Sequence, residues 1–205
     1  MRLVLIRHAE TDSNVRHVLD SRPPGPPLNA EGVRQAARLA RRLAGEPLAA
    51  VYASVALRAR QTAQAVAEVH GLEVTVRDGL HEVDVGDLEG RADLPAVERL
   101  IAVYRSWHAG NLDVPVPGGE SGRDLLDRFL PVVDKIRVDH AENETAALVS
   151  HSAAIRLVAR TLASNVDSLF ADAHLVPNAG AVVLEADGAG WRCMSWDGVT
   201  VRPQD

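Results

Sequence analysis

Two arginines and two histidines occupy positions in this sequence where they could do chemistry. Arg7 and His8 follow a run of apolar residues, Arg58 follows a second run, and His151 follows a third. A guanidinium group binds phosphate oxygens through paired, charge-assisted hydrogen bonds, whereas a neutral imidazole can attack phosphorus or donate a hydrogen bond. If these four side chains meet, the sequence predicts a site for a phosphorylated ligand.

Phosphoryl transfer also requires a nucleophile and a proton for the leaving oxygen. We predict His8 as the nucleophile, because an ordinary histidine pKa of about 6.5 leaves a large neutral fraction at pH 7. A nearby backbone carbonyl is expected to hold its other ring nitrogen. Glu82 is the predicted acid, which protonates the departing alcohol and then activates water. Asp84, Glu89 and Glu10 remain alternatives for that role.

The elements that must position these residues can be read from the pattern of apolar residues. Runs of strand length alternate with segments of helical period, a pattern typical of βαβ units and a largely parallel sheet. We expect strands at 2–6, 48–53, 73–77 and 145–149, helices at 30–44, 56–70 and 152–163, mostly helical structure at 91–143, and a C-terminal hairpin from 181–185 and 191–195.

Parallel strands bring distant residues together, because ligands bind beyond their carboxyl ends. The four side chains and Glu82 each follow such a strand, so we expect them in one crevice. The helices that begin near Ala56 and Ser152 are expected to add free backbone N–H groups for an anion. The long irregular segment 9–29 is expected to be a functional loop.

Several segments of the sequence resemble the motifs of a known family. Leu5-Ile6-Arg7-His8-Ala9-Glu10-Thr11 is similar to the RHG motif of the histidine phosphatase superfamily, which includes cofactor-dependent phosphoglycerate mutases. Further segments resemble its motifs in the same order: Asn14, Pro27 to Ala36, Ser54 to Ala63, Leu80 to Gly90, Pro117-Gly118-Gly119-Glu120-Ser121 and Val149-Ser150-His151. The departures are Ala9 and Ser152 in place of glycine and Leu88 in place of tryptophan. None removes a reacting group.

The resemblance implies a division of roles among six residues. His8 and Glu82 would be catalytic, whereas the phosphate would be bound by Arg7, Asn14, Arg58 and His151. The expected fold is a single α/β domain over residues 1–205: a three-layer αβα sandwich with a mostly parallel central sheet, an antiparallel C-terminal edge and a helical insertion, about 91–143, over the site. No metal or cofactor is expected. Asn14 could instead cap a turn.

We therefore expect a metal-independent phosphatase that hydrolyses a small phosphomonoester. Mutases of the family tend to be longer, with an extra segment that closes the site. Because this sequence is short, we prefer a phosphatase, and a phosphoglycerate mutase is the alternative. An inactive phosphoester-binding protein and a metal-dependent hydrolase remain further alternatives. Only the metal-dependent hydrolase should lose its activity in the presence of a chelator. The physiological substrate cannot be read from the sequence.

Composition limits the partners and the location. A net charge of −6 argues against nucleic-acid binding, and we expect the stripe Arg34, Arg38, Arg41 and Arg42 to be a solvated helix face. Cys193 is the sole cysteine, and no signal peptide or membrane span is expected, so a cytoplasmic location is predicted. A small phosphorylated substrate is the expected partner. A homodimer through an edge strand or an insertion helix stays open. The remaining histidines are expected at the surface: 17, 70, 81, 108, 140 and 174.

Overall fold

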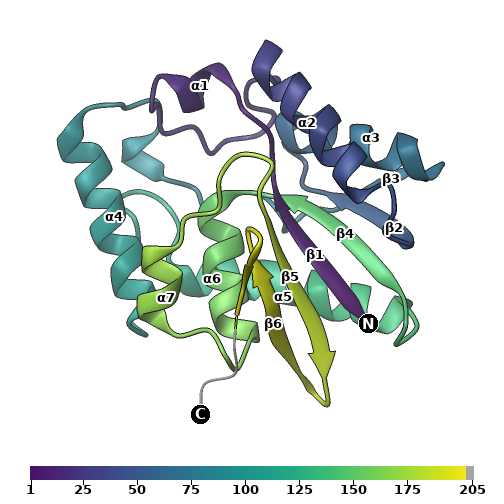
Figure 1. Ribbon diagram of the computed structural model, residues 1–205. Coiled ribbons are helices and arrows are strands. Elements are labelled where there is room, and N and C mark those ends of the chain that lie inside the picture. Colours follow the sequence, from purple (N-terminus) through teal and green to yellow (C-terminus); the bar gives the residue numbers. More distant parts are fainter. Residues whose placement is uncertain (202–205) are drawn as a thin grey trace.

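The computed structural model describes residues 1–201, which fold around one central sheet (Figure 1). Its strand order is β3-β2-β4-β1-β5-β6-β7. The strands are β1 (Arg2–Arg7), β2 (Leu48–Ala53), β3 (Val74–Val76), β4 (Thr145–Ser150), β5 (Ala181–Asp187), β6 (Gly190–Trp196) and β7 (Val199–Thr200).

The sheet has a parallel half and an antiparallel half. β1 pairs with β4, and β2 pairs with β3 and β4, all in parallel. β5, β6 and β7 add an antiparallel edge next to β1. The mostly parallel sheet and the antiparallel C-terminal edge predicted from the sequence are confirmed. β1 and β4 therefore lie side by side at the centre of the sheet and end at the same edge.

Helices cover both faces of this sheet, as expected for a three-layer sandwich (Figure 1). Alternate residues of β1 point to opposite faces. Val4 and Ile6 pack with α2 (Ala30–Leu43) and α3 (Leu57–His70), whereas Leu3 and Leu5 belong to the core that also contains residues of α5 (Gly122–Asp139) and α6 (Ser152–Leu162). The remaining helices are α1 (Asp12–Val15), α4 (Leu94–His108), α7 (Ser168–Ala173) and the 3₁₀ turn η1 (Gly86–Leu88).

The helical stretch predicted at 91–143 divides into two parts with different surroundings. α5 begins at a capping box, in which the side chains of Ser121 and Asp124 bond each other's backbone, and its apolar side joins the core. α4 packs against α6 and α7 instead. That α4 covers a bound substrate stays a prediction.

Four short elements were not expected: α1, η1, α7 and β7. α1 lies inside the segment 9–29, where its one turn is held by a reciprocal cap between Thr11 and Asn14. Such elements are too short to show a hydrophobic period, which needs a window of about 11–18 residues. Within residues 1–201, every helix is too short or too polar to cross a lipid bilayer.

Candidate active site

A small polar cavity lies at the carboxyl ends of β1 and β4. It has a volume of about 80 Å³, enough for a few water molecules or one tetrahedral anion, since a water's share of liquid volume is roughly 30 Å³. All six predicted site residues line it. The complete lining is Arg7, His8, Thr11, Ser13, Asn14, Val18, Asp20, Arg58, Glu82, His151 and Ser152.

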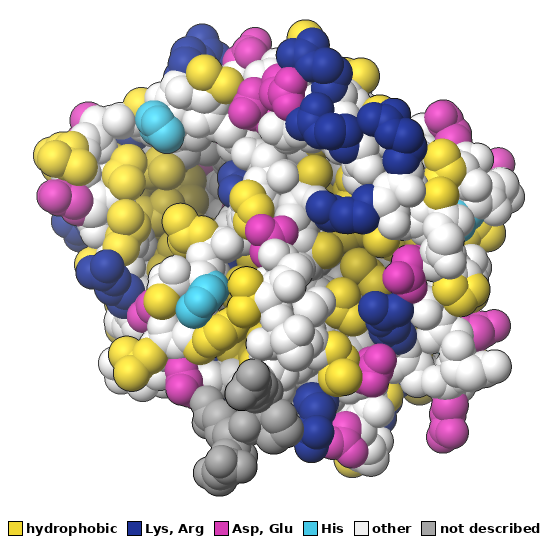
Figure 2. Space-filling model, in the orientation of Figure 1, with side chains coloured by type: hydrophobic (Ala, Val, Ile, Leu, Met, Phe, Trp, Pro, Cys, Tyr) yellow, Lys and Arg dark blue, Asp and Glu magenta, His cyan; other side chains and the backbone are white. Residues whose placement is uncertain are grey.

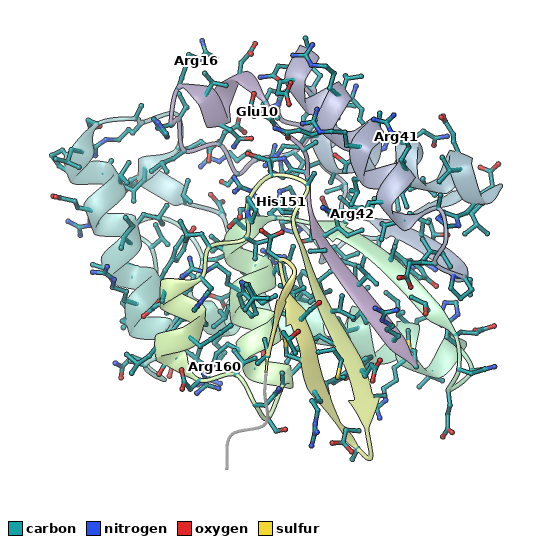
Figure 3. All side chains as sticks on the ribbon, viewed as in Figure 1. Glu10, Arg16, Arg41, Arg42, His151 and Arg160 are labelled. Atoms are coloured by element: carbon teal, nitrogen blue, oxygen red, sulfur yellow. The ribbon has the colours of Figure 1, made fainter. Side chains whose placement is uncertain are left out.

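The register of the sheet explains why the two histidines meet. Arg7 at the end of β1 lies opposite Ser150 at the end of β4, so the next residues, His8 and His151, leave the sheet together. The His8 N–H donates to the Ser150 carbonyl at 2.9 Å, and the two imidazole centroids are 5.1 Å apart. Figure 3 shows His151 close to the start of α6.

The His8 ring is held in one tautomer. Nδ1 lies 2.7 Å from the Ala9 carbonyl oxygen, which can only accept, so Nδ1 carries the proton. Nε2 accepts a hydrogen bond from Arg58 Nε at 3.2 Å. Burial, followed by the charges of Arg58 and Arg7, holds the pKa of His8 well below its ordinary value. His8 is therefore a neutral imidazole at pH 7 whose Nε2 lone pair faces the Arg58 guanidinium, and the predicted backbone anchor is present.

Three buried nitrogens at this cavity have no hydrogen-bond partner among the described residues: Arg7 Nε, Arg58 Nη1 and His151 Nδ1. Arg7 is otherwise anchored by Nη1 to the Val176 carbonyl at 2.8 Å, and Arg58 by Nη2 to the Asp20 carbonyl at 3.0 Å. Leaving a buried polar group unpaired costs about 1–3 kcal/mol, and more for a charged group. An oxyanion bound among these groups would accept hydrogen bonds from these nitrogens.

Burial also acts on the two arginines themselves. Desolvation lowers the pKa of both guanidinium groups, while the carboxylate of Glu82 opposes the shift in each case and Asp20 opposes it at Arg58. The Arg58 side chain is 3% exposed, and its Nη1 lies 3.7 Å from Asp20 Oδ1. Both side chains thus present positive charge where water is largely excluded, which strengthens their attraction for an anion.

His151 is oriented by Ser54, a residue to which the sequence assigned no role. Ser54 Oγ lies 2.8 Å from His151 Nε2 and accepts from the Ala56 N–H at 3.4 Å. The other ring nitrogen, His151 Nδ1, has no hydrogen-bond partner among the described residues. Burial lowers the pKa of His151 well below its ordinary value, with Arg58 contributing next. Ser54 belongs to the segment that resembles a family motif, and this was the available signal.

Glu82 is held at the cavity by backbone N–H groups. Oε1 accepts from Val83 at 3.1 Å and from Ala154 at 2.9 Å, and Oε2 accepts from Ala153 at 3.1 Å. The expectation that the first turn of α6 offers free N–H groups to a ligand was therefore wrong for Ala153 and Ala154, because Glu82 caps that helix. It was also wrong for Leu57 in α3, which donates to the Pro24 carbonyl.

Asn14 both caps α1 and lines the cavity. Its Oδ1 accepts from the Thr11 backbone N–H at 3.1 Å, from the Thr11 hydroxyl at 3.2 Å and from Asn178 Nδ2 at 3.1 Å. The two interpretations of Asn14 are thus compatible. With the oxygen occupied, its NH₂ group is the part that can donate to a phosphoryl oxygen.

The alternative acids lie away from the cavity, but an unexpected one lines it. Glu89 accepts from the Ser21 backbone and hydroxyl, and Asp84 accepts from the Gly86 N–H. Neither lines the cavity, nor does Glu10, whereas Asp20 does. No motif in the sequence distinguished Asp20 from the rest of its long loop.

The histidines that were expected at the surface differ in exposure: His17 is exposed, whereas His70, His81, His140 and His174 are half-buried. His108 is 4% exposed rather than at the surface, because its Nδ1 bonds the Asp172 carboxylate where α4 meets α7. Within residues 1–201, no three His, Cys, Asp or Glu side chains come together in a way that could hold a metal ion.

Comparisons with known proteins show the family of the chain. The family model described as "Histidine phosphatase superfamily (branch 1)" matches residues 3–198. Phosphoserine phosphatase 1 of Hydrogenobacter thermophilus is 32% identical over 160 residues, which cover 76% of this chain and 73% of that protein. Phosphoglycerate mutase-like protein 4 of Arabidopsis thaliana is 31% identical, covering 97% of this chain and 85% of that protein.

Solved structures agree as well. The mycobacterial glucosyl-3-phosphoglycerate phosphatase Rv2419c, in complex with VO3, is 26% identical with a TM-score of 0.82, covering 96% of this chain and 98% of that one. Some relatives are much longer: this chain spans only 36% of the PE-PGRS family protein PE_PGRS11 of Mycobacterium tuberculosis, to which it is 32% identical. The family match covers nearly the whole chain, and the chain belongs to the histidine phosphatase superfamily.

Proposed function

We propose that this protein is a metal-independent phosphatase that hydrolyses a small phosphomonoester through a phosphohistidine intermediate on His8. The observation that carries the proposal is the His8 ring. It is neutral, it is fixed through Nδ1 by the Ala9 carbonyl, and its Nε2 faces a cavity lined by the half-buried Arg7 and the buried Arg58. A cavity of about 80 Å³ suits the phosphoryl group alone, so the rest of the substrate would remain outside it.

In the first step, His8 Nε2 attacks phosphorus and the bond from phosphorus to the ester oxygen breaks. Arg58 Nε, which donates to Nε2 in the free protein, would turn to the incoming phosphoryl oxygens. Arg7, Arg58, His151 and the NH₂ group of Asn14 would neutralise and orient those oxygens. The products of this step are the phosphohistidine and the leaving alcohol.

Glu82 supplies the proton that the leaving oxygen takes up. Its carboxyl group is held in place at the cavity by the start of α6. In the second step, Glu82 takes a proton from water, which attacks the phosphohistidine. The bond from Nε2 to phosphorus breaks, inorganic phosphate leaves, and neutral His8 is restored.

A mutase is the second candidate, because one relative carries a phosphoglycerate mutase-like name. In that reaction the phosphoryl group on His8 returns to a second hydroxyl instead of water. The names of other relatives suggest phosphoserine and glucosyl-3-phosphoglycerate as first substrates to test, together with sugar phosphates and nucleotides.

The test compares phosphate release over such a panel with isomerisation of 3-phosphoglycerate. We expect phosphate release, acid-labile label on the protein from a labelled phosphomonoester, and full activity in chelator. Isomerisation without phosphate release would favour the mutase. Binding of phosphate without any labelling would indicate an inactive phosphoester-binding protein, and loss of activity in chelator would indicate a metal-dependent hydrolase.

Several sequence predictions remain predictions. These are the single domain over 1–205, the cytoplasmic location, and the absence of nucleic-acid and membrane partners.

A further inference from the structure

The segment that joins α7 to β5 supports the cavity from behind. Arg7 donates from Nη1 to the Val176 carbonyl and from its backbone N–H to the Gly180 carbonyl, the latter at 3.0 Å. The Ala179 N–H donates to the His8 carbonyl at 3.3 Å. Ala179 adopts a φ of +57°, which is uncommon for a residue other than glycine, so this backbone path is specifically held by its contacts.

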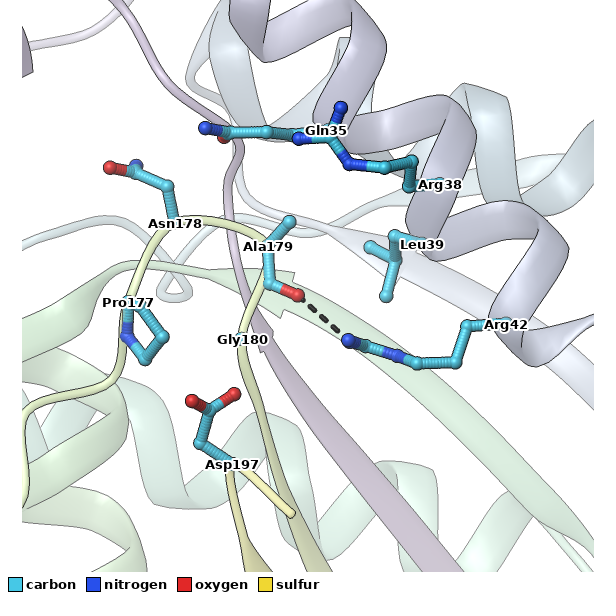
Figure 4. A pocket seen from close by; sticks show the side chains of 9 residues that line it. All are labelled: Gln35, Arg38, Leu39, Arg42, Pro177, Asn178, Ala179, Gly180 and Asp197. Carbon is cyan, nitrogen blue, oxygen red and sulfur yellow. Dashed lines mark hydrogen bonds between the residues drawn. The ribbon is translucent and has the colours of Figure 1, made fainter.

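On its other side, the same segment forms one wall of a groove against α2 (Figure 4). Arg42 donates from Nη2 to the Ala179 carbonyl at 3.0 Å across this groove. Figure 4 shows the Asn178 side chain directed away from Arg42 and Asp197. Asn178 is also among the residues that line this groove, but the hydrogen bonds of its side chain run to the cavity side of the segment.

Asn178 donates both hydrogens of its amide group to the site. Nδ2 lies 3.1 Å from the His8 carbonyl oxygen and 3.1 Å from Asn14 Oδ1. The first partner can only accept. The second is identified as an oxygen because the Thr11 backbone N–H donates to it at 3.1 Å. The orientation of the Asn178 amide thus follows from the chemistry of its partners.

This arrangement fixes the direction of the Asn14 side chain. Its oxygen receives three donors, two from Thr11 and one from Asn178, so its NH₂ group must point elsewhere. Asn14 lines the cavity that holds His8 and Arg58. Because Asn178 bonds the His8 backbone as well, the nucleophile and the Asn14 amide are held in one common frame.

We propose that Asn178 is a positioning residue that ties the Asn14 amide to the His8 backbone and so aims the Asn14 NH₂ group at the bound phosphoryl group. This inference rests on the proposed function of the cavity. Asn178 acts through Asn14 and does not itself line the cavity.

The first experiment measures the affinity for inorganic phosphate by calorimetry in Asn178→Ala and Asn178→Asp. Asn178→Ala should weaken binding by about tenfold, the loss expected for one hydrogen bond to a charged group. Asn178→Asp keeps nearly the same side-chain size but places a carboxylate oxygen against the His8 carbonyl oxygen and Asn14 Oδ1. This variant should therefore bind phosphate more weakly than Asn178→Ala. Asn178→Asp with wild-type affinity would mean that only packing matters and would overturn the proposal.

A double-mutant cycle tests whether Asn178 acts through Asn14. The variant Asn14→Ala should lose phosphate affinity, and adding Asn178→Ala should then change the dissociation constant by less than about twofold. Independent, additive losses would overturn the proposal. If thermal unfolding shows that Asn178→Asp is not folded, the phosphate affinity of Asn178→Ala and the double-mutant cycle still test the proposal.

Arg42→Ala is the matched control, because it removes a hydrogen bond to the same segment from the groove side. Its phosphate affinity should stay within about twofold of wild type; an equal loss would show that loosening the segment suffices, against the proposal. Phosphate binding needs no turnover. If the wild-type protein hydrolyses no phosphomonoester while the cycle behaves as expected, the proposed function fails and the positioning role stands.

Discussion

Two places in this molecule present a pair of arginines. The two pairs have the same charge but differ in burial and in hydrogen bonding. Arg7 and Arg58 flank His8 in a cavity of about 80 Å³, whereas Arg38 and Arg42 lie one helical turn apart on α2 in a groove of about 370 Å³. Figure 2 shows Lys and Arg side chains gathered over α2, so the groove lies within the more conspicuous basic region.

The difference lies in burial and in hydrogen bonding. The Arg58 side chain is 3% exposed and has a buried nitrogen with no hydrogen-bond partner, whereas the Arg38 side chain is 54% exposed and already hydrogen-bonded to Glu31. Water and salt screen exposed charges, whereas a buried donor without a hydrogen-bond partner destabilises the folded protein until an anion binds to it. The comparison teaches that this anion site is distinguished by several unmet hydrogen bonds that meet at one cavity, rather than by the number of positive charges.

The largest effect should come from the nucleophile in the cavity. His8→Ala should lower kcat/KM by at least about 10⁴-fold, because no covalent intermediate can form. Thermal unfolding should show a folded protein. Steady-state phosphate release checks this, and activity above about 1% of wild type would move the nucleophile to another residue.

The two arginine pairs can be compared directly. Arg58→Ala should lower kcat/KM by about 10²–10³-fold, the range found when a transition-state donor is removed, and Arg58→Lys should not restore it because the fork geometry is lost. Arg42→Ala should change kcat/KM by less than about twofold. Similar losses at Arg58 and Arg42 would break the comparison.

The acid in the cavity should reveal itself through leaving groups. Glu82→Gln should slow alkyl phosphates by about 10²-fold, within the usual contribution of general acid catalysis. Aryl phosphates, whose leaving groups need little protonation, should slow much less. Asp20→Asn is the control, since Asp20 is the other carboxylate of the cavity. A leaving-group dependence for Asp20→Asn and none for Glu82→Gln would exchange their roles.

The smallest effect concerns stability and pH. The pKa of His8 is lowered in the folded protein by burial and the two arginines, so between its ordinary value and the lowered value the unfolded chain binds a proton that the folded chain does not. The free energy of unfolding should therefore fall as the pH falls below about 6.5.

Removing the imidazole should flatten this dependence. His8→Ala should reduce the fall by on the order of 1 kcal/mol per pH unit, measured by urea unfolding between pH 7 and 5.5. Arg42→Ala should keep the wild-type slope. Identical slopes in wild type and His8→Ala would show that burial of this imidazole does not affect stability as argued.

The sequence by itself determined which residues would meet. Arg7-His8 and His151 follow runs whose alternation with helices implies neighbouring parallel strands, and such strands end at one edge. Arg58 and Glu82 follow the other strands in the same way, and Asn14 came from the family resemblance. Strand periodicity is local, so it could be read without coordinates.

The tertiary structure alone decided the state and the supports of these residues. The neutral state of His8 depends on burial and on Arg58, and the Ala153 and Ala154 N–H groups of α6 are occupied because Glu82 lies against that helix. Asp20 lines the cavity from the long loop without any motif of its own, and Asn178 supports the cavity from a segment with no distinguishing pattern. Desolvation and hydrogen bonds between distant segments arise only when the whole chain packs, so no local sequence pattern records them.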